Sequence, residues 1–177
     1  MLELIRDRAI VRDTYHLRTD TLDGILPEED VIVSPALLAA ERARLDQHQG
    51  KLGVWLETSE GPEIIAADLA RLDLVVVHFS SFTDGRGHST ARLLRERYGF
   101  RGELRAAGDV FKETLHYLSR CGFNAFALRP GESLTHALGG LDVFSEAYQT
   151  SVERQSPLFR RRLQNVASNV ASEENPL

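Results

Sequence analysis

The residues best placed to do chemistry lie in one loop, Thr83-Asp84-Gly85-Arg86-Gly87, with Ser89 just after it. The two glycines allow backbone conformations that other residues rarely adopt. If Ser89 caps a helix, the free N–H groups and the positive dipole end of that helix gather at this loop. Because Arg86 adds a guanidinium group at the same point, we expect the loop to bind an anionic ligand.

Two aspartates are the candidates for proton transfer. Asp84 lies in the loop, and Asp109 follows Gly108 at the start of another predicted helix. Carboxylates at such positions often accept backbone N–H groups, so a turn or capping role is the alternative for each. If both face one pocket, they form a carboxylate pair suited to general acid–base catalysis. We therefore assign Gly108 and Asp109 to the same expected ligand site as the loop.

The other reactive side chains form no familiar motif. The six histidines lack metal-ligand spacing, so no metal site is expected, although His78 and His88 could reach the ligand loop. Cys121, the single cysteine, falls in the last turn of a predicted helix, where we expect a packed, unreactive thiol. The sequence has no dinucleotide fingerprint, Walker phosphate loop or G-x-S-x-G nucleophile motif, so no cofactor is implied.

From residue 31 onward, strand-like and helix-like segments alternate. Short apolar runs rich in β-branched residues indicate buried strands, and apolar residues at helical spacing separate them. The five predicted strands cover 31–33, 52–56, 74–77, 102–107 and 124–128. The predicted helices begin near Ser34-Pro35, residue 64, Ser89, Asp109 and Ser133, and the last extends to Tyr148. This alternation is typical of α/β proteins with a mainly parallel sheet, either open and doubly wound or a partial β/α barrel.

A parallel sheet would bring the chemical residues together. In such folds the ligand lies at the carboxyl ends of the strands, where loops lead into helix N-termini. This rule places Ser34, residues 78–88, Gly108-Asp109 and 129–131 along one rim. Between Arg86 and Arg105, six arginines stand against two acidic residues. That excess favours an anionic ligand or an acidic patch on a partner, unless the helical arginines simply face solvent.

Composition and length limit the possible domain organisation, binding partners and location of the protein. The chain fits one α/β domain over residues 1–150, opened by a β-hairpin at 1–20 and followed by a partly disordered tail at 151–177. A net charge of −5 argues against binding to nucleic acid or to anionic membranes. No apolar run is long enough to span a membrane, and a single cysteine fits a reducing, cytoplasmic location.

A resemblance to a known family rests on two segments, FTDGRGHSTARLLRERYGFRGELRAAGDV and LHYLSRCGFNAFAL. Their blocks and spacing resemble the DUF934 proteins, a bacterial family of unknown function, over most of residues 30–150. The chain departs from that pattern at His88, where the family usually has tyrosine, and at Glu113-Thr114-Leu115, where it has D-Q-L. Family members are typically encoded beside sulfite reductase and are often labelled probable oxidoreductases of sulfite reduction. The resemblance therefore implies a role in sulfate assimilation, but it implies no active site.

Three functions remain open. The first is an accessory protein of assimilatory sulfite reduction that binds sulfite reductase, another sulfate-assimilation enzyme or an anionic ligand through the rim. The second is a small enzyme acting on a phosphorylated or sulfur-containing anion held by Arg86, with Asp84 or Asp109 moving protons. The third is a structural interaction module. A redox reaction in this chain itself would require flavin, haem or iron–sulfur chemistry that no motif supplies.

Overall fold

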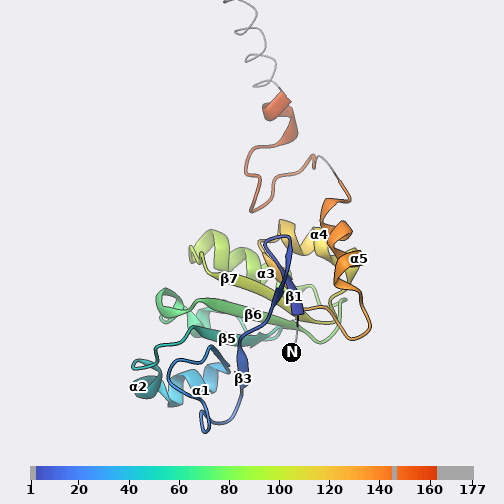
Figure 1. Ribbon diagram of the computed structural model, residues 1–177. Helices are drawn as coiled ribbons and strands as arrows, with labels where there is room; N and C mark the ends of the chain where they lie inside the picture. The colour runs from blue at the N-terminus through green and yellow to red at the C-terminus, as the bar shows by residue number, and fades with distance from the viewer. Residues whose placement is uncertain (1–2, 145–146, 163–177) are drawn as a thin grey trace, which may run out of the picture.

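The computed structural model describes residues 3–144 and 147–162 (Figure 1). Eight strands form one sheet in the order β2-β1-β8-β7-β6-β5-β4-β3. Their bounds are β1 (Glu3–Arg6), β2 (Ala9–Arg12), β3 (His16–Arg18), β4 (Val31–Val33), β5 (Leu52–Glu57), β6 (Leu74–Phe79), β7 (Glu103–Gly108) and β8 (Ala125–Phe126).

Six strands, β3 to β8, run parallel in chain order, which confirms the mainly parallel sheet. All five strands predicted from residue 31 onward are present, with small shifts at their ends. The N-terminal hairpin is also present as β1 and β2, and it pairs antiparallel with β8. Residues 16–18, predicted as part of that hairpin, instead form β3 and pair with β4 at the opposite edge. The sheet is therefore mixed rather than purely parallel.

The short link between β2 and β3 forces the sheet to curl. These two strands are its edges, yet only Asp13, Thr14 and Tyr15 separate them. Four Cα steps span at most about 14 Å, whereas eight flat strands at about 4.8 Å spacing would hold the edges roughly 34 Å apart. The sheet accordingly forms a half-barrel, and the link crosses its inner face (Figure 1). Of the two architectures left open by the sequence, the partial barrel is the observed one.

The helices are shorter than the sequence predicts. They are α1 (Pro35–Ala40), α2 (Arg42–Leu45), α3 (Arg86–Arg92), α4 (Lys112–Arg120) and α5 (Leu134–Leu138), with 3₁₀ turns η1 (Pro62–Ile65), η2 (Leu69–Arg71) and η4 (Gly139–Asp142) and a π-helical turn η3 (Leu93–Arg97). The helix predicted near 64–72 is thus two 3₁₀ turns. The helix predicted at 133–148 is reduced to α5 and η4 within the described residues, because Gly139-Gly140 favour the end of a helix.

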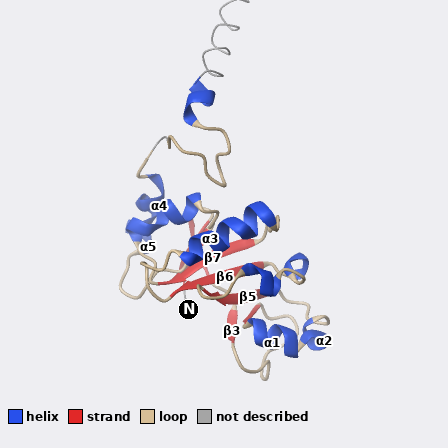
Figure 2. Cartoon of the chain, turned by 180° about the vertical axis from the view of Figure 1, so that it is seen from behind, coloured by secondary structure: helices blue, strands red, loops and turns tan. Residues whose placement is uncertain are grey.

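The helices cover the outer face of the half-barrel (Figure 2). Side chains alternate along β6, so Val75, Val77 and Phe79 join the main core beneath the helices. Leu74 and Val76 belong to a smaller apolar cluster on the inner face. The predicted helix starts at Ser34-Pro35 and Ser133 are confirmed, since the hydroxyls of Ser34 and Ser133 accept backbone N–H groups in the first turns of α1 and α5.

Arg105 joins the inner face of the sheet to the link between β2 and β3. Its Nη1 lies 2.9 Å from Oδ2 of Asp13, and its Nε donates to Oε1 of Glu103 at 2.8 Å. The Tyr15 ring lies over the guanidinium group at 5.4 Å. Because only 4% of the Arg105 side chain is exposed, these ion pairs are largely shielded from solvent. A buried charge therefore holds the link against the concave side of the sheet.

The segment after the domain is only partly described. Residues 151–162 are mostly irregular and end in a short helix at 158–162, while the disorder expected at 163–177 concerns residues outside the described ranges. Within residues 3–144 and 147–162, no helix has the length and apolar character needed to cross a membrane.

Replacing Arg105 with alanine should destabilise the fold by about 3–5 kcal/mol, because Asp13 would lose its arginine and Glu103 one of its partners in a shielded site. Arg92→Ala is the control. Arg92, the last residue of α3, forms an exposed ion pair with Glu96 of η3, and such pairs contribute at most about 1 kcal/mol. Urea unfolding followed by circular dichroism measures both variants, and equal losses would contradict a structural role for the buried network.

Candidate functional site

The predicted site residues lie at one rim, formed by the carboxyl ends of β5, β6 and β7. The carboxylate of Asp109, just after β7, accepts the backbone N–H of Phe82 at 3.1 Å. The carboxylate of Asp84 accepts the hydroxyl of Thr58, just after β5, at 2.6 Å. The two aspartates therefore connect the loop after β6 to the neighbouring strands on both sides.

Arg86 is already paired with a carboxylate of the protein itself. Its Nε and Nη2 donate to the two oxygens of Asp84 at 2.9 Å and 2.7 Å, and its backbone N–H donates to Oδ1 of Asp84 at 3.2 Å. Hydrogen bonds from Arg86, and then from Thr58, hold the pKa of Asp84 well below its usual range. Asp84 thus occupies the position expected for an anionic ligand, and its stable ionisation makes it a poor proton donor at neutral pH.

Asp109 is paired in the same way, but it does not cap α4. Its Oδ1 accepts from Nη1 of Arg129 at 3.0 Å, and the Phe82 N–H and Arg129 together lower its pKa. The N-cap of α4 is Phe111, whose backbone N–H donates to the Thr114 hydroxyl. The capping role predicted for Asp109 is therefore wrong, because its carboxylate is turned toward Phe82 and Arg129. Each aspartate has its own arginine, and no interaction joins Asp84 to Asp109 as a carboxylate pair.

The predicted start of α3 also shifts. Gly85 takes the N-cap position and the helix begins at Arg86, so Ser89 lies exposed inside the first turns rather than at the cap. Asp84 explains the shift, since it accepts the Arg86 N–H and so turns the chain earlier. Thr83 is exposed, and its hydroxyl lies 2.8 Å from that of Ser81.

The glycines of this region serve packing more than ligand approach. A Cβ at Gly87 would lie 2.6 Å from the ring of Phe79, whereas a Cβ at Gly85 would meet nothing within 4 Å. Gly108 has φ +91, and a Cβ there would lie 2.2 Å from the Phe79 carbonyl and 2.9 Å from Nε2 of His78. Gly87 and Gly108 therefore allow close contact between α3, β6 and β7.

An apolar pocket opens at the rim between α3 and α4, and no sequence pattern indicated it. This rim pocket has a volume of about 260 Å³, and its lining includes Phe79, Phe82, His88, Asp109 and Tyr117. Phe82 and Tyr117 are 54% and 58% exposed, so two large aromatic surfaces beside the cavity are open to solvent. The one available signal was a phenylalanine placed in a polar loop.

His88 forms one wall of the rim pocket as an aromatic rather than a charged group. Its ring centroid lies 5.2 Å from that of Phe79 and 5.0 Å from that of Tyr117. Burial lowers the pKa of His88, so the imidazole is neutral at physiological pH. The pocket is thus suited to an apolar or aromatic group.

A second group of polar side chains lies on the inner face of the sheet, near the carboxyl ends of β5 and β6, where Glu57 of β5 lies opposite His78 of β6. Nδ1 of His78 is 2.8 Å from Oε2 of Glu57, and Nε1 of Trp55 donates to Oε1 of Glu57 at 2.8 Å. Burial alone would raise the pKa of Glu57, but the hydrogen bonds from His78 and Trp55 lower it. A carboxylate that accepts from Nδ1–H leaves Nε2 of the imidazole as a proton acceptor.

The described residues offer no other reactive cluster at the rim. No group of three His, Cys, Asp or Glu side chains in residues 3–144 and 147–162 could hold a metal ion. Cys121 is buried, and burial raises the pKa of its thiol.

Gly87→Ala should destabilise the fold by about 1–3 kcal/mol, because the added methyl group overlaps the Phe79 ring. Gly85→Ala, two residues earlier in the same loop, is the matched control and should change stability by no more than about 0.5 kcal/mol. Thermal unfolding of both variants tests the packing role of Gly87. A larger loss at Gly85 would instead favour a conformational role for the loop.

The lowered pKa of Asp84 predicts an acid-sensitive contribution to stability. In the unfolded chain an aspartate titrates near pH 4, whereas the folded protein keeps Asp84 charged to lower pH. The contribution is therefore complete above about pH 5 and is lost as the pH falls further. Between about pH 5 and pH 2, the melting temperature should fall less steeply in Asp84→Asn than in the wild type. Asp20→Asn, at an exposed position, serves as the control and should follow the wild-type curve.

Comparison with known proteins agrees with the family resemblance. No curated protein matches the chain. Among solved structures, a designed, cube-shaped, highly porous protein cage made by fusing symmetric oligomeric domains aligns at 15% identity and a TM-score of 0.25, over 90% of this chain and 79% of that chain. A TM-score this low supports no argument about fold or function. The model of a family described as bacterial proteins of unknown function (DUF934) matches residues 53–159, more than half of the chain, and the protein therefore belongs to the DUF934 family.

Proposed function

We propose that this protein is an accessory component of assimilatory sulfite reduction, which binds a partner protein of that process through the rim pocket. Membership of the DUF934 family supports the biological setting, since the family resemblance implies a role in sulfate assimilation. The observation that carries the binding role is the apolar pocket with two exposed aromatic side chains, Phe82 and Tyr117.

The chemistry of the rim pocket fits an apolar anchor on a protein partner. Exposed aromatic residues around a preformed cavity are typical of sites that bind one inserted side chain of a partner. Phe82 packs edge-to-face on Phe111 at 5.6 Å, so it is held in place before any partner arrives. Such preorganisation lowers the entropy cost of binding.

The arginines around the rim pocket are paired with carboxylates of the protein itself, which is typical of the polar edge of a protein interface rather than of an anion-binding site. Arg86 is neutralised by Asp84, and Arg129 is shared between Asp109 and Glu132. Because these pairs are internally satisfied, a partner could cover them without leaving a single charge unpaired. This accessory function needs no redox centre in the chain itself.

The Glu57–His78 pair supports a second candidate function, a small enzyme that removes a proton from its substrate. Glu57 would fix the imidazole tautomer and orientation, and Nε2 of His78 would accept the proton. Within the described residues, Nε2 of His78 has no hydrogen-bond partner, so it is available for this role. Asp84 and Asp109 have no part in this version, because both are held as ion pairs.

Phe82→Ser and Tyr117→Ser should each weaken binding to purified assimilatory sulfite reductase by at least about tenfold, because each removes an aromatic contact at the pocket mouth. Ile64→Ser is the matched control, since Ile64 is 50% exposed but lies on η1, outside the pocket lining. Biolayer interferometry with immobilised reductase measures the three variants.

Unchanged binding in both pocket variants would contradict the accessory role of the rim pocket. His78→Asn separates the two candidates, because it removes the proton acceptor without changing the pocket. Loss of a small-molecule turnover in His78→Asn, with binding to the reductase intact, would favour the enzyme.

A further inference from the structure

The lining of the rim pocket includes a carboxylate without a partner, that of Glu113. Glu113 is exposed in the first turn of α4. Within residues 3–144 and 147–162, no ion pair or hydrogen bond involves its carboxylate. Asp109, the other carboxylate of the lining, is held by Arg129. The rim pocket therefore has one unpaired negative charge, and this charge is open to solvent.

The basic groups of this region do not compensate Glu113. Among the described residues, the lining of the rim pocket contains no lysine or arginine. Lys112, the neighbour of Glu113 in sequence, is directed to α5, where its Nζ lies 2.9 Å from Nε2 of His136. Arg129 pairs with two other carboxylates, and His88 is neutral because burial lowers its pKa. A positive group that pairs with Glu113 would therefore come from a partner.

Glu113 and Tyr117 form adjacent parts of one surface. They are four residues apart on α4, so their side chains lie on the same face of the helix, one turn from each other. The Tyr117 ring contacts the ring of His88, and more than half of the residue is exposed. A carboxylate beside an exposed aromatic ring suits a guanidinium group, because that group can pair with the carboxylate and stack on the ring.

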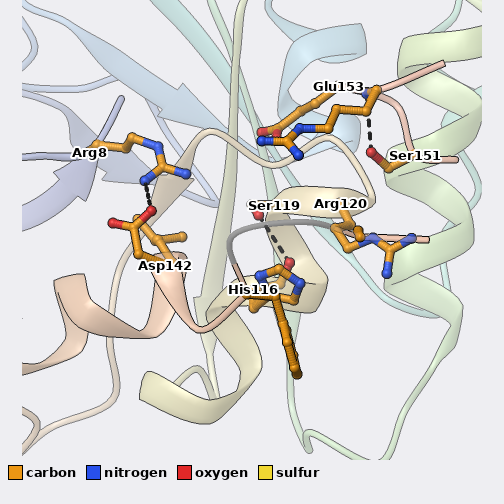
Figure 3. A pocket seen from close by; sticks show the side chains of 11 residues that line it. Arg8, His116, Ser119, Arg120, Asp142, Ser151 and Glu153 are labelled. Atoms are coloured by element: carbon orange, nitrogen blue, oxygen red, sulfur yellow. Dashed lines mark hydrogen bonds and ion pairs between the residues drawn. The ribbon is translucent and has the colours of Figure 1, made fainter. Parts of the chain in front are cut away.

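A cavity on another face of α4, toward the end of the helix, has a different character (Figure 3). Most of its lining consists of polar and charged side chains. Arg8 and Asp142, on one side of it, form an ion pair with each other (Figure 3). The combination of an apolar cavity, exposed aromatic rings and an unpaired carboxylate is therefore a property of the rim pocket.

We propose that the partner segment bound in the rim pocket carries an arginine next to its apolar anchor, and that this arginine pairs with Glu113 and stacks on Tyr117. The proposal rests on the accessory function proposed above and names the chemistry of its partner. The apolar anchor fills the cavity, while the arginine stays at the exposed edge, where its charge remains partly hydrated. Glu113 repels an acidic segment, so the same contact contributes to the choice of partner.

Biolayer interferometry with immobilised sulfite reductase tests the arginine contact. Glu113→Gln keeps the shape of the side chain, removes its charge and should weaken binding about fivefold, because one ion pair at the edge of the interface is lost. Glu63→Gln is the matched control, since Glu63 is an exposed acid in the first turn of η1, outside the pocket lining. Equal weakening in Glu63→Gln would overturn the proposal. Weakening by Phe82→Ser but not by Glu113→Gln would also overturn it, and would leave the accessory function standing.

An NMR titration tests the same contact without the reductase. The isotope-labelled protein is titrated with N-acetyl-leucyl-arginine amide and with its citrulline analogue, which keeps the shape of arginine but lacks its charge. The arginine peptide should shift the backbone signals of Phe82 and Tyr117 and bind about fivefold more tightly than the citrulline peptide. The two peptides should bind equally to Glu113→Gln.

The two experiments separate the proposal from the accessory function. A reductase that does not bind the wild type would contradict the accessory function, whereas a preference for the arginine peptide that depends on Glu113 would still support the arginine site. The absence of shifts at the rim pocket, or an equal preference in Glu113→Gln, would overturn the arginine site itself.

Discussion

The connection of two edge strands by residues 13–15 is the constraint on which the rest of the structure depends. Because the link is so short, the sheet bends toward it and the helices are left on the outer face alone. In a complete β/α barrel the interior is filled by layers of apolar side chains. Here Arg105, Asp13 and Glu103 occupy part of that space, so an ionic network replaces the missing part of the barrel core.

The parallel pairing of β5, β6 and β7 places their carboxyl ends side by side, so the loops that follow them bond to each other. The loop after β6 supplies an arginine and an aspartate that neutralise one another, and Asp109 is satisfied by Arg129. The features that resemble an anion site in the sequence therefore stabilise the rim itself. The surfaces still available there are an apolar cavity and a histidine oriented by Glu57.

Local patterns predicted the parts of the fold that depend on local physics. The apolar run Leu74–Val77, rich in β-branched valine, correctly predicted a strand, and Ser34-Pro35 correctly predicted the start of a helix. Both features depend on only a few neighbouring residues. The position of β3 was not predicted. Its three residues have no strong pattern, and they pair with β4 at the edge of the sheet opposite the hairpin. The Glu57–His78 pair was missed for a related reason. This pair depends on which residue of β5 lies opposite which residue of β6. The hydrophobic pattern does not fix that register, because parallel strands buried on both faces are apolar along their whole length.

The pairing of β1 with β8 has a consequence for synthesis on the ribosome. Ile5 pairs with Phe126, so β1 leaves the exit tunnel long before β8, its neighbour in the sheet, is synthesised. β3 can join β4 early, but the hairpin must wait until more than a hundred further residues have been translated. Until then its edges are open to pairing with other nascent chains. The exposed, arginine-bearing surface of β2 opposes such association.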